Sequence, residues 1–292
     1  MDVAIHLGAH CTDASRLRKT LMRNRAELSG LGVVVPDAKD YRDVLRTVMN
    51  RLRGDPGDDA TRDVLLEAMG ADETTERLVL SNANFISMVS MAVEYGQIYP
   101  KIAKAAWLRN LFPDSPVAFF ISVRNPATFL PAVFEEAGRP EAEFPAFLTR
   151  AEPQILRWSD TIAALREACP DCPVTVWCHE DTPLFWPEII HRVAGVRGEM
   201  PLKGMFDMLR PVMTGEGMNR LRVYTRAHPP ATEKARRQVM TAFLDKFAHP
   251  DAIEEERSLP GWSADLVQRL STLYEADLGA IAALPGVTLL PD

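Results

Sequence analysis

Residues 3–17 read VAIHLGAHCTDASRL and combine a short apolar run, a glycine-containing turn and the start of a basic helix. The apolar run Val3–Leu7 predicts a buried strand, and Gly8 directly after it predicts a turn. A turn between a strand and a helix start points backbone N–H groups at one place, where the helix dipole also attracts negative charge. The segment Gly8–Ser15 is therefore a candidate anion-binding turn.

The helix after this turn is expected to run from Ala14 to Ser29, with Gly30 ending it. One face carries leucines at helical spacing, namely Leu17, Leu21 and Leu28. The other faces carry basic residues, namely Arg16, Arg18, Lys19, Arg23 and Arg25. These charges fit a solvated helix face as well as they fit an anion site. The Walker pattern Gly-x-x-x-x-Gly-Lys-Ser/Thr is absent, so the turn is not that of an ordinary ATP-hydrolysing protein.

The rest of the chain alternates short apolar runs with helical stretches. Further strands are predicted at Val33–Val35, Leu78–Leu80, Val117–Val123 and Val174–Trp177. A helix is expected around Ile98–Phe112, before the longest of these strands. Strands separated by helices form parallel βαβ units with helices on both faces of the sheet. Ligands of such sheets lie beyond the carboxyl ends of the strands, which selects the turns Gly8–Ser15, Ser81–Asn84 and Arg124–Pro126.

The expected fold class is therefore α/β, with a central parallel sheet and a helix-rich C-terminal part. From about residue 200 onward the pattern is mainly helical, and it ends in an amphipathic helix near Ala264–Leu284. No internal repeat, low-complexity tract or long linker divides the chain. Residues 1–292 are expected to form a single domain, with a helical subregion at about 200–292.

Composition and charge narrow the class of protein. Hydrophobic residues make up 47% of the 292 residues and charged residues 25%, as in an ordinary globular protein. A formal charge of −7 argues against general nucleic-acid binding, which needs a dominant basic face. No apolar run has the length of a membrane span, and Met1–His6 does not resemble a signal peptide. A cytoplasmic protein without nucleic-acid or membrane partners is expected.

The four cysteines raise the question of a metal or redox site. Cys169 and Cys172 are spaced as Cys-x-x-Cys, and Cys178 and His179 follow. The second pair of ligands that a normal zinc module needs is missing. The cysteine pair also precedes a strand, whereas a redox Cys-x-x-Cys pair follows a strand and opens a helix. No metal is expected, and the sequence leaves the role of these cysteines open.

Two blocks of the chain resemble the donor-binding motifs of bacterial sulfotransferases. The run His6–Leu17 resembles the 5′-phosphosulfate loop, which commonly reads His-x-Gly-x-His-Lys-Thr-Gly-Thr-Thr-x-Leu. The block Val117–Ala132 resembles the 3′-phosphate strand and helix, Arg-Asn/Asp-x-x-x-x-x-x-Ser, and Arg124 fits its arginine. The resemblance implies a P-loop NTPase-like three-layer fold, 3′-phosphoadenosine 5′-phosphosulfate as the donor, and no metal. The sulfuryl group would pass to a hydroxyl or amine of a small-molecule or carbohydrate acceptor.

The resemblance also implies which residues would contact the nucleotide. They are Gly8, Ala9, His10, Cys11, Thr12, Asp13, Ala14, Ser15, Arg124 and Ala132. His10 is the candidate general base, because it lies in the ligand-facing turn and a histidine titrates near neutral pH.

The chain departs from the family's pattern at several of these positions. Cys11 stands where the loop lysine belongs, Asp13 where glycine is usual, and Ala14 where the family has a threonine. Ala132 stands where the second motif has its serine. A carboxylate in the turn would repel a phosphosulfate.

Two hypotheses remain. The protein is a sulfotransferase-like protein that binds a 3′-phosphoadenosine-type nucleotide, with sulfuryl transfer left open. Alternatively, it is a catalytically inactive binding or regulatory protein that retains the fold. The sequence leaves the acceptor and the oligomeric state open.

Overall fold

A six-stranded parallel sheet forms the centre of the protein, in the strand order β2-β3-β1-β6-β7-β8. The structure is a computed structural model that describes residues 1–13, 15–198, 200–249 and 259–291. The strands are β1 (Asp2–His6), β2 (Val33–Val34), β3 (Arg77–Ser81), β6 (Val117–Val123), β7 (Val174–Cys178) and β8 (Val287–Leu290). A separate antiparallel hairpin consists of β4 (Val93–Glu94) and β5 (Gln97–Ile98).

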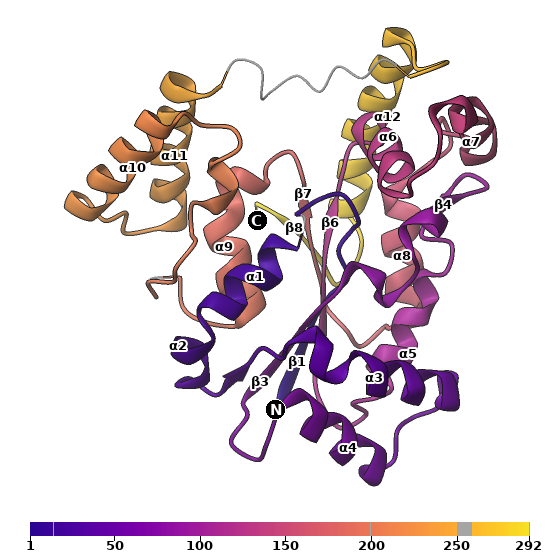
Figure 1. Cartoon of the computed structure of the whole chain (residues 1–292), viewed down its shortest axis with the longest axis vertical. Helices are drawn as coiled ribbons and strands as arrows, with labels where there is room; N and C mark the ends of the chain where they lie inside the picture. Colours follow the sequence, from indigo (N-terminus) through magenta and orange to yellow (C-terminus); the bar gives the residue numbers. More distant parts are fainter. Residues whose placement is uncertain (14, 199, 250–258, 292) are drawn as a thin grey trace.

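Helices cover both faces of this sheet (Figure 1). They are α1 (Arg16–Arg23), α2 (Arg25–Ser29), α3 (Ala38–Leu52), α4 (Asp59–Met69), α5 (Ala105–Arg109), α6 (Pro126–Glu136), α7 (Phe144–Ala151), α8 (Trp158–Ala168), α9 (Thr182–Ala194), α10 (Gly215–Ala227), α11 (Glu233–Phe247) and α12 (Ala264–Ala282). Short 3-10 helices are η1 (Ala83–Phe85), η2 (Val89–Met91), η3 (Ile102–Lys104), η4 (Glu141–Glu143) and η5 (Asp207–Leu209).

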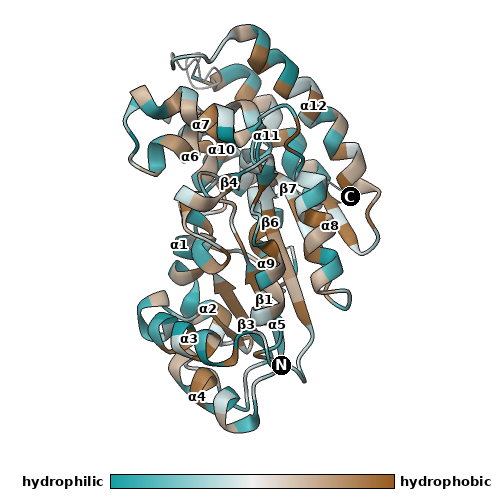
Figure 2. Ribbon diagram, turned by 90° about the vertical axis from the view of Figure 1, so that its right-hand side faces the viewer, coloured by the Kyte–Doolittle hydropathy of each residue, from teal (hydrophilic) through white to brown (hydrophobic). Residues whose placement is uncertain are grey.

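The alternation of side chains along β1 separates two cores. Val3 and Ile5 pack with helices α3 to α8 and α12, whereas Ala4 packs with α1, α2 and α9 on the opposite face. In Figure 2 the central strands are brown, while the outward faces of the flanking helices carry teal. This arrangement confirms the α/β three-layer architecture with a central parallel sheet that the sequence predicted.

Two expected helices are shorter or broken. The helix expected over Ala14–Ser29 is interrupted at Asn24, whose side chain donates to the Lys203 carbonyl and accepts from the Lys203 amide. This contact with a distant segment redirects the backbone between α1 and α2. The helix expected around Ile98–Phe112 contains only η3 and α5, because Ile98 belongs to β5 and Tyr99 adopts a φ of 50°.

The C-terminal part contains a strand that the helical pattern did not predict. Helices α10, α11 and α12 account for most of this part, as expected, and β8 then pairs parallel with β7 at the sheet edge. Its four residues are too few for a periodic signal, and only Leu290 is buried. Figure 1 shows the α10–α11 hairpin beside α9, away from the sheet. Among the described residues, no helix combines the length and apolarity that a membrane crossing requires.

The three turns selected from the sequence meet at the carboxyl edge of the sheet. The chain leaves β1 toward β2 and β3 on one side and later adds β6 on the other side, so the strand order reverses at β1. The amide of Asn82 donates to the His6 carbonyl, and the Arg124 guanidinium donates to the Cys11 carbonyl. The expected convergence of these turns is confirmed.

Candidate functional site

The Gly8–Ser15 turn follows β1 and folds tightly back on itself. Gly8 has a φ of 106°, and a Cβ there would lie 3.1 Å from the Cβ of Ala83, so the position needs glycine. Cys11 and Ser15 also adopt left-handed backbone angles. The Thr12 hydroxyl donates to the Ala9 carbonyl at 2.8 Å, which closes the turn internally. Ala14 lies outside the described residues.

The Asp13 carboxylate occupies the amino end of α1. One of its oxygens accepts the amide of Ser15 at 3.0 Å, and the other accepts the amide of Leu17 at 2.9 Å. The Ser15 side chain makes no capping hydrogen bond. Amides at the start of a helix are the donors that bind a phosphate or sulfate in an anion-binding turn. In this protein they are bonded to a carboxylate of the chain itself.

Arg124 and α6 lie against the other side of the turn. The Arg124 side chain is buried, donates to the Cys11 carbonyl at 2.5 Å and donates to the Thr128 hydroxyl at 2.8 Å. The Cys11 thiol donates to the Glu136 carboxylate at 3.0 Å. Ala132 lies on α6 one turn after Thr128 and one turn before Glu136, on the same helix face. The two sequence blocks are therefore brought together as the resemblance implies.

His10 is held by two partners from separate segments. Its amide donates to the Tyr99 hydroxyl at 2.8 Å, and its Nδ1 lies 2.7 Å from the same oxygen. Since that oxygen accepts the amide hydrogen, its own proton is directed to Nδ1, which leaves the ring proton on Nε2. Nε2 lies 2.9 Å from Oδ1 of Asn84, a carbonyl acceptor, which fits this tautomer. Burial lowers the pKa of His10 and raises that of Tyr99, so both groups are neutral at pH 7.

Tyr99 and Asn84 form part of the site through this contact with His10. Asn84 belongs to a turn that the strand pattern had selected, but its contact with His10 had no sequence signal. Tyr99 lies 89 residues from His10 and belongs to no motif, so its contact with His10 could not be predicted from the sequence.

His6, at the end of β1, has one ring nitrogen with no hydrogen-bond partner among the described residues. Its Nδ1 lies 2.9 Å from the Ser81 hydroxyl, and its ring stacks on Trp177 with centroids 5.7 Å apart. The residue is only 3% exposed, and its Nε2 has no hydrogen-bond partner among the described residues. Burial lowers the pKa of His6, against the influence of the Asp13 carboxylate.

A half-buried histidine, His179, follows β7 at the same edge. His179 has an Nδ1 atom that lacks a hydrogen-bond partner within the described ranges, and the same holds for the Ser122 hydroxyl on β6. Burial, helped by the charge of Arg124, lowers the pKa of His179 to about 4. The edge of the sheet beneath the turn thus holds neutral polar groups with unused hydrogen-bonding capacity.

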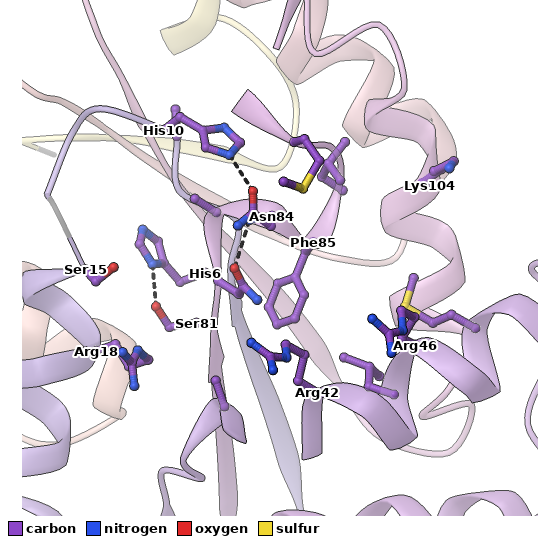
Figure 3. A pocket seen from close by; sticks show the side chains of 18 of the residues that line it. His6, His10, Ser15, Arg18, Arg42, Arg46, Ser81, Asn84, Phe85 and Lys104 are labelled. Atoms are coloured by element: carbon purple, nitrogen blue, oxygen red, sulfur yellow. Dashed lines mark hydrogen bonds between the residues drawn. The ribbon is translucent and has the colours of Figure 1, made fainter. Parts of the chain in front are cut away.

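A cavity of about 710 Å³ opens between the Gly8–Ser15 turn and helix α3 (Figure 3). His6, His10 and Asn84 line its inner side, next to the carboxyl edge of the sheet. Four cationic side chains line it further out, namely Arg18, Arg42, Arg46 and Lys104. The carboxylates that line it among the described residues are Asp13 and Glu136, both already hydrogen-bonded. The cavity is lined by most of the predicted turn, by Arg18 of the basic helix, and by three basic residues that the sequence analysis did not name, Arg42, Arg46 and Lys104.

The cysteine pair lies away from this cavity. Cys169 and Cys172 precede β7 and are buried free thiols, at the opposite end of that strand from the turn. Cys178 is buried at the carboxyl end, where burial raises the pKa of its thiol to about 11. Among the described residues, no group of three or more His, Cys, Asp or Glu side chains is placed to hold a metal ion.

Comparisons with known proteins give one structural likeness. No family model matches this chain, and no curated protein matches it. The crystal structure of a sulfotransferase from Alicyclobacillus acidocaldarius is similar to it over 90% of this chain and 98% of that chain. The sequence identity is 12% and the TM-score is 0.40. This likeness assigns no function to this chain.

Proposed function

We propose that this protein binds a small ligand in the cavity beside the Gly8–Ser15 turn and acts as a binding or regulatory protein without sulfuryl-transfer activity. The observation that carries the proposal is the position of the Asp13 carboxylate. It already accepts the amides of Ser15 and Leu17, which an incoming phosphosulfate would need.

The charges around the turn support the same conclusion. A phosphosulfate-binding turn needs positive charge at the transferred group, because such transfers depend on electrostatic stabilisation. Position 11, where the resemblance expects a lysine, is a cysteine whose thiol donates to Glu136. Asp13 and Glu136 thus put two carboxylates beside the turn, and both act against a doubly charged donor.

The bonding of His10 also disfavours transferase chemistry. A general base needs a lone pair within reach of the proton that it removes. The lone pair of the neutral His10 ring is directed to Tyr99, and the ring N–H is directed to Asn84. His10 is therefore a hydrogen-bonded residue of the cavity wall. Its assignment as a general base stays a prediction.

One observation favours the alternative, a nucleotide-binding transferase. Arg124 lies within 2.5 Å of the turn at the carbonyl of Cys11, where the resemblance expects a phosphate-binding arginine. With Thr12 and Ser15 nearby in the same turn, this guanidinium would be the main contact to a nucleotide phosphate.

Titration with adenosine 3′,5′-bisphosphate distinguishes the two functions. A ligand that binds only the folded state at one hundred times its Kd stabilises it by roughly 2.7 kcal/mol, which raises Tm. We expect no saturable heat in calorimetry and no rise in Tm at millimolar nucleotide. Saturable binding with a rise in Tm would overturn the proposal and favour the transferase.

A further inference from the structure

Helix α3 lines the cavity with a face that carries both apolar and basic side chains. The residues of α3 that line the cavity recur at helical spacing, namely Ala38, Tyr41, Arg42, Leu45, Arg46, Met49 and Asn50. Tyr41 and Leu45 are buried, whereas Arg42 and Arg46 are exposed with side chains 65% and 69% accessible. Apolar side chains from other segments, including Phe85 and Trp107, extend the apolar part of the lining. The cavity therefore has an apolar wall and a cationic rim.

The cations of this rim are only partly neutralised by the protein. Arg42 lies 3.8 Å and Arg46 lies 3.1 Å from the same carboxylate, that of Asp43, so two guanidinium groups share one anion. The ammonium of Lys104 lies 5.2 Å from the centre of the Trp107 ring. Exposed pairs of this kind contribute little, so the rim retains positive charge that a ligand can use.

The inner end of the cavity offers a neutral hydrogen-bonding group. His6 is buried, lines the cavity and has no partner for its Nε2 atom among the residues described. A buried polar atom without a partner costs free energy, which a bound ligand recovers by supplying the missing hydrogen bond. This second observation, independent of the charges, points to an occupant that reaches the end of β1.

We infer that the occupant of the cavity is an amphipathic organic anion. Its single carboxylate group pairs with Arg42 and Arg46, its apolar or aromatic body lies along α3 and Phe85, and a polar atom reaches Nε2 of His6. A volume of about 710 Å³ suits a molecule of small-ligand size. The inference rests on the proposed function, because it names the ligand class of the same cavity.

Calorimetry with a matched pair of probes tests the inference. The probes are 2-naphthoate, which carries the charge, and 2-naphthamide, which has the same ring system and no charge. We expect 2-naphthoate to bind more tightly than 2-naphthamide, and inorganic sulfate to bind more weakly than 2-naphthoate because it lacks the apolar body. Added salt weakens the binding of 2-naphthoate, since its charged part lies near solvent.

A pair of double variants locates the binding. Arg42→Gln with Arg46→Gln is expected to weaken 2-naphthoate binding about tenfold and to leave 2-naphthamide binding unchanged. Arg25→Gln with Arg226→Gln removes the same charge from exposed positions that do not line the cavity, and it should leave both affinities unchanged. All four side chains are exposed, so both variants are expected to fold.

Each outcome bears on one proposal. Equal binding of the two probes, no binding of 2-naphthoate at millimolar concentration, or equal loss in the two double variants would overturn the inference of an anionic occupant. None of these results would restore a phosphosulfate site, which the titration with adenosine 3′,5′-bisphosphate tests separately.

Discussion

Asp13 places a negative charge at the amino end of α1, where backbone amides commonly bind an anion. Its carboxylate bonds the amides of Ser15 and Leu17, so removing it frees both donors. Changing Asp13→Gly and Cys11→Lys replaces repulsion with attraction, and each change is expected to contribute roughly one to a few kcal/mol in a partly buried anion site. Together they should strengthen the binding of adenosine 3′,5′-bisphosphate by about two orders of magnitude. Calorimetry at matched ionic strength measures the change.

A capping aspartate elsewhere provides the control for this repair. Asp58 caps α4 by accepting the amide of Thr61, so Asp58→Gly loses a similar cap and the same charge far from the turn. It should leave nucleotide affinity unchanged. If the folded double variant at Asp13 and Cys11 bound no better than the parent, the turn would not be a disabled phosphosulfate loop.

The Tyr99 hydroxyl is expected to stabilise the turn through His10. It is buried and bonds both the amide and the ring of His10, so Tyr99→Phe leaves two polar groups without a partner. The expected loss is about 1–3 kcal/mol of unfolding free energy in urea titrations. Tyr95→Phe, at a side chain that is 72% exposed, serves as the control and should change stability little. Similar stability of the two variants would show that the bonds to His10 are dispensable.

At the level of the helices, the break between α1 and α2 depends on the Asn24 side chain. Asn24 is buried and exchanges two hydrogen bonds with the backbone of Lys203, besides donating to the Thr20 carbonyl. Asn24→Ala raises local helix propensity but leaves the Lys203 groups unpaired, and the second effect is larger. Stability is expected to fall by about 1–3 kcal/mol, measured by urea unfolding.

The matched control for this helix break is Asn219→Ala. Asn219 is exposed within α10, where alanine should leave stability unchanged or slightly raised. A neutral or stabilising effect of Asn24→Ala would mean that propensity, and not the contact with Lys203, sets the boundary between α1 and α2.

For the whole molecule, the buried histidines predict sensitivity to acid. Burial lowers the pKa values of His6, His10 and His179 in the folded state, and that of His179 falls from 6.5 to about 4. Below pH 6.5 the unfolded chain therefore binds more protons than the folded one, so their contribution to stability is full above that pH and is lost as the pH falls. Burial raises the pKa values of Glu180 and Asp181, which acts in the opposite direction in acid.

The variant His179→Gln measures how much His179 contributes to the pH dependence of the unfolding free energy. Between pH 7 and pH 5, the parent is expected to lose roughly 2 kcal/mol more unfolding free energy than His179→Gln, because the variant has no imidazole to protonate. Urea titrations at the two pH values measure the difference. His228→Gln, at an exposed position, should keep the full pH dependence of the parent. An unchanged pH dependence in His179→Gln would show that His179 takes up its proton equally in both states.

Local sequence was sufficient to predict five of the six strands of the parallel sheet and the meeting of three turns at its carboxyl edge. A strand, a turn and a helix start can each be predicted from a few neighbouring residues, because strand burial, turn geometry and helix periodicity are short-range properties. This holds for the strand Val3–Leu7, the turn at Gly8 and the basic helix that follows. The parallel topology then required Arg124 to meet the turn, since the carboxyl ends of parallel strands lie on one edge. The edge strand Val287–Leu290 was not predicted, because its four residues are mostly half-buried and give no clear apolar pattern.

The chemical state of the site depended on contacts between distant segments. The sequence named His10 as a candidate base, but only the tertiary structure shows that Tyr99 and Asn84 bond its ring. Likewise, only the structure shows that the Cys11 thiol donates to the carboxylate of Glu136, 125 residues away. The sequence showed that the charge of Asp13 would oppose an anion, but it did not show which groups the Asp13 carboxylate bonds. The structure shows that it accepts the amide of Ser15. Pairing of this kind depends on which side chains the packing of whole elements brings within about 3 Å, and a hydrogen bond of that length has no trace in the spacing of residues along the chain.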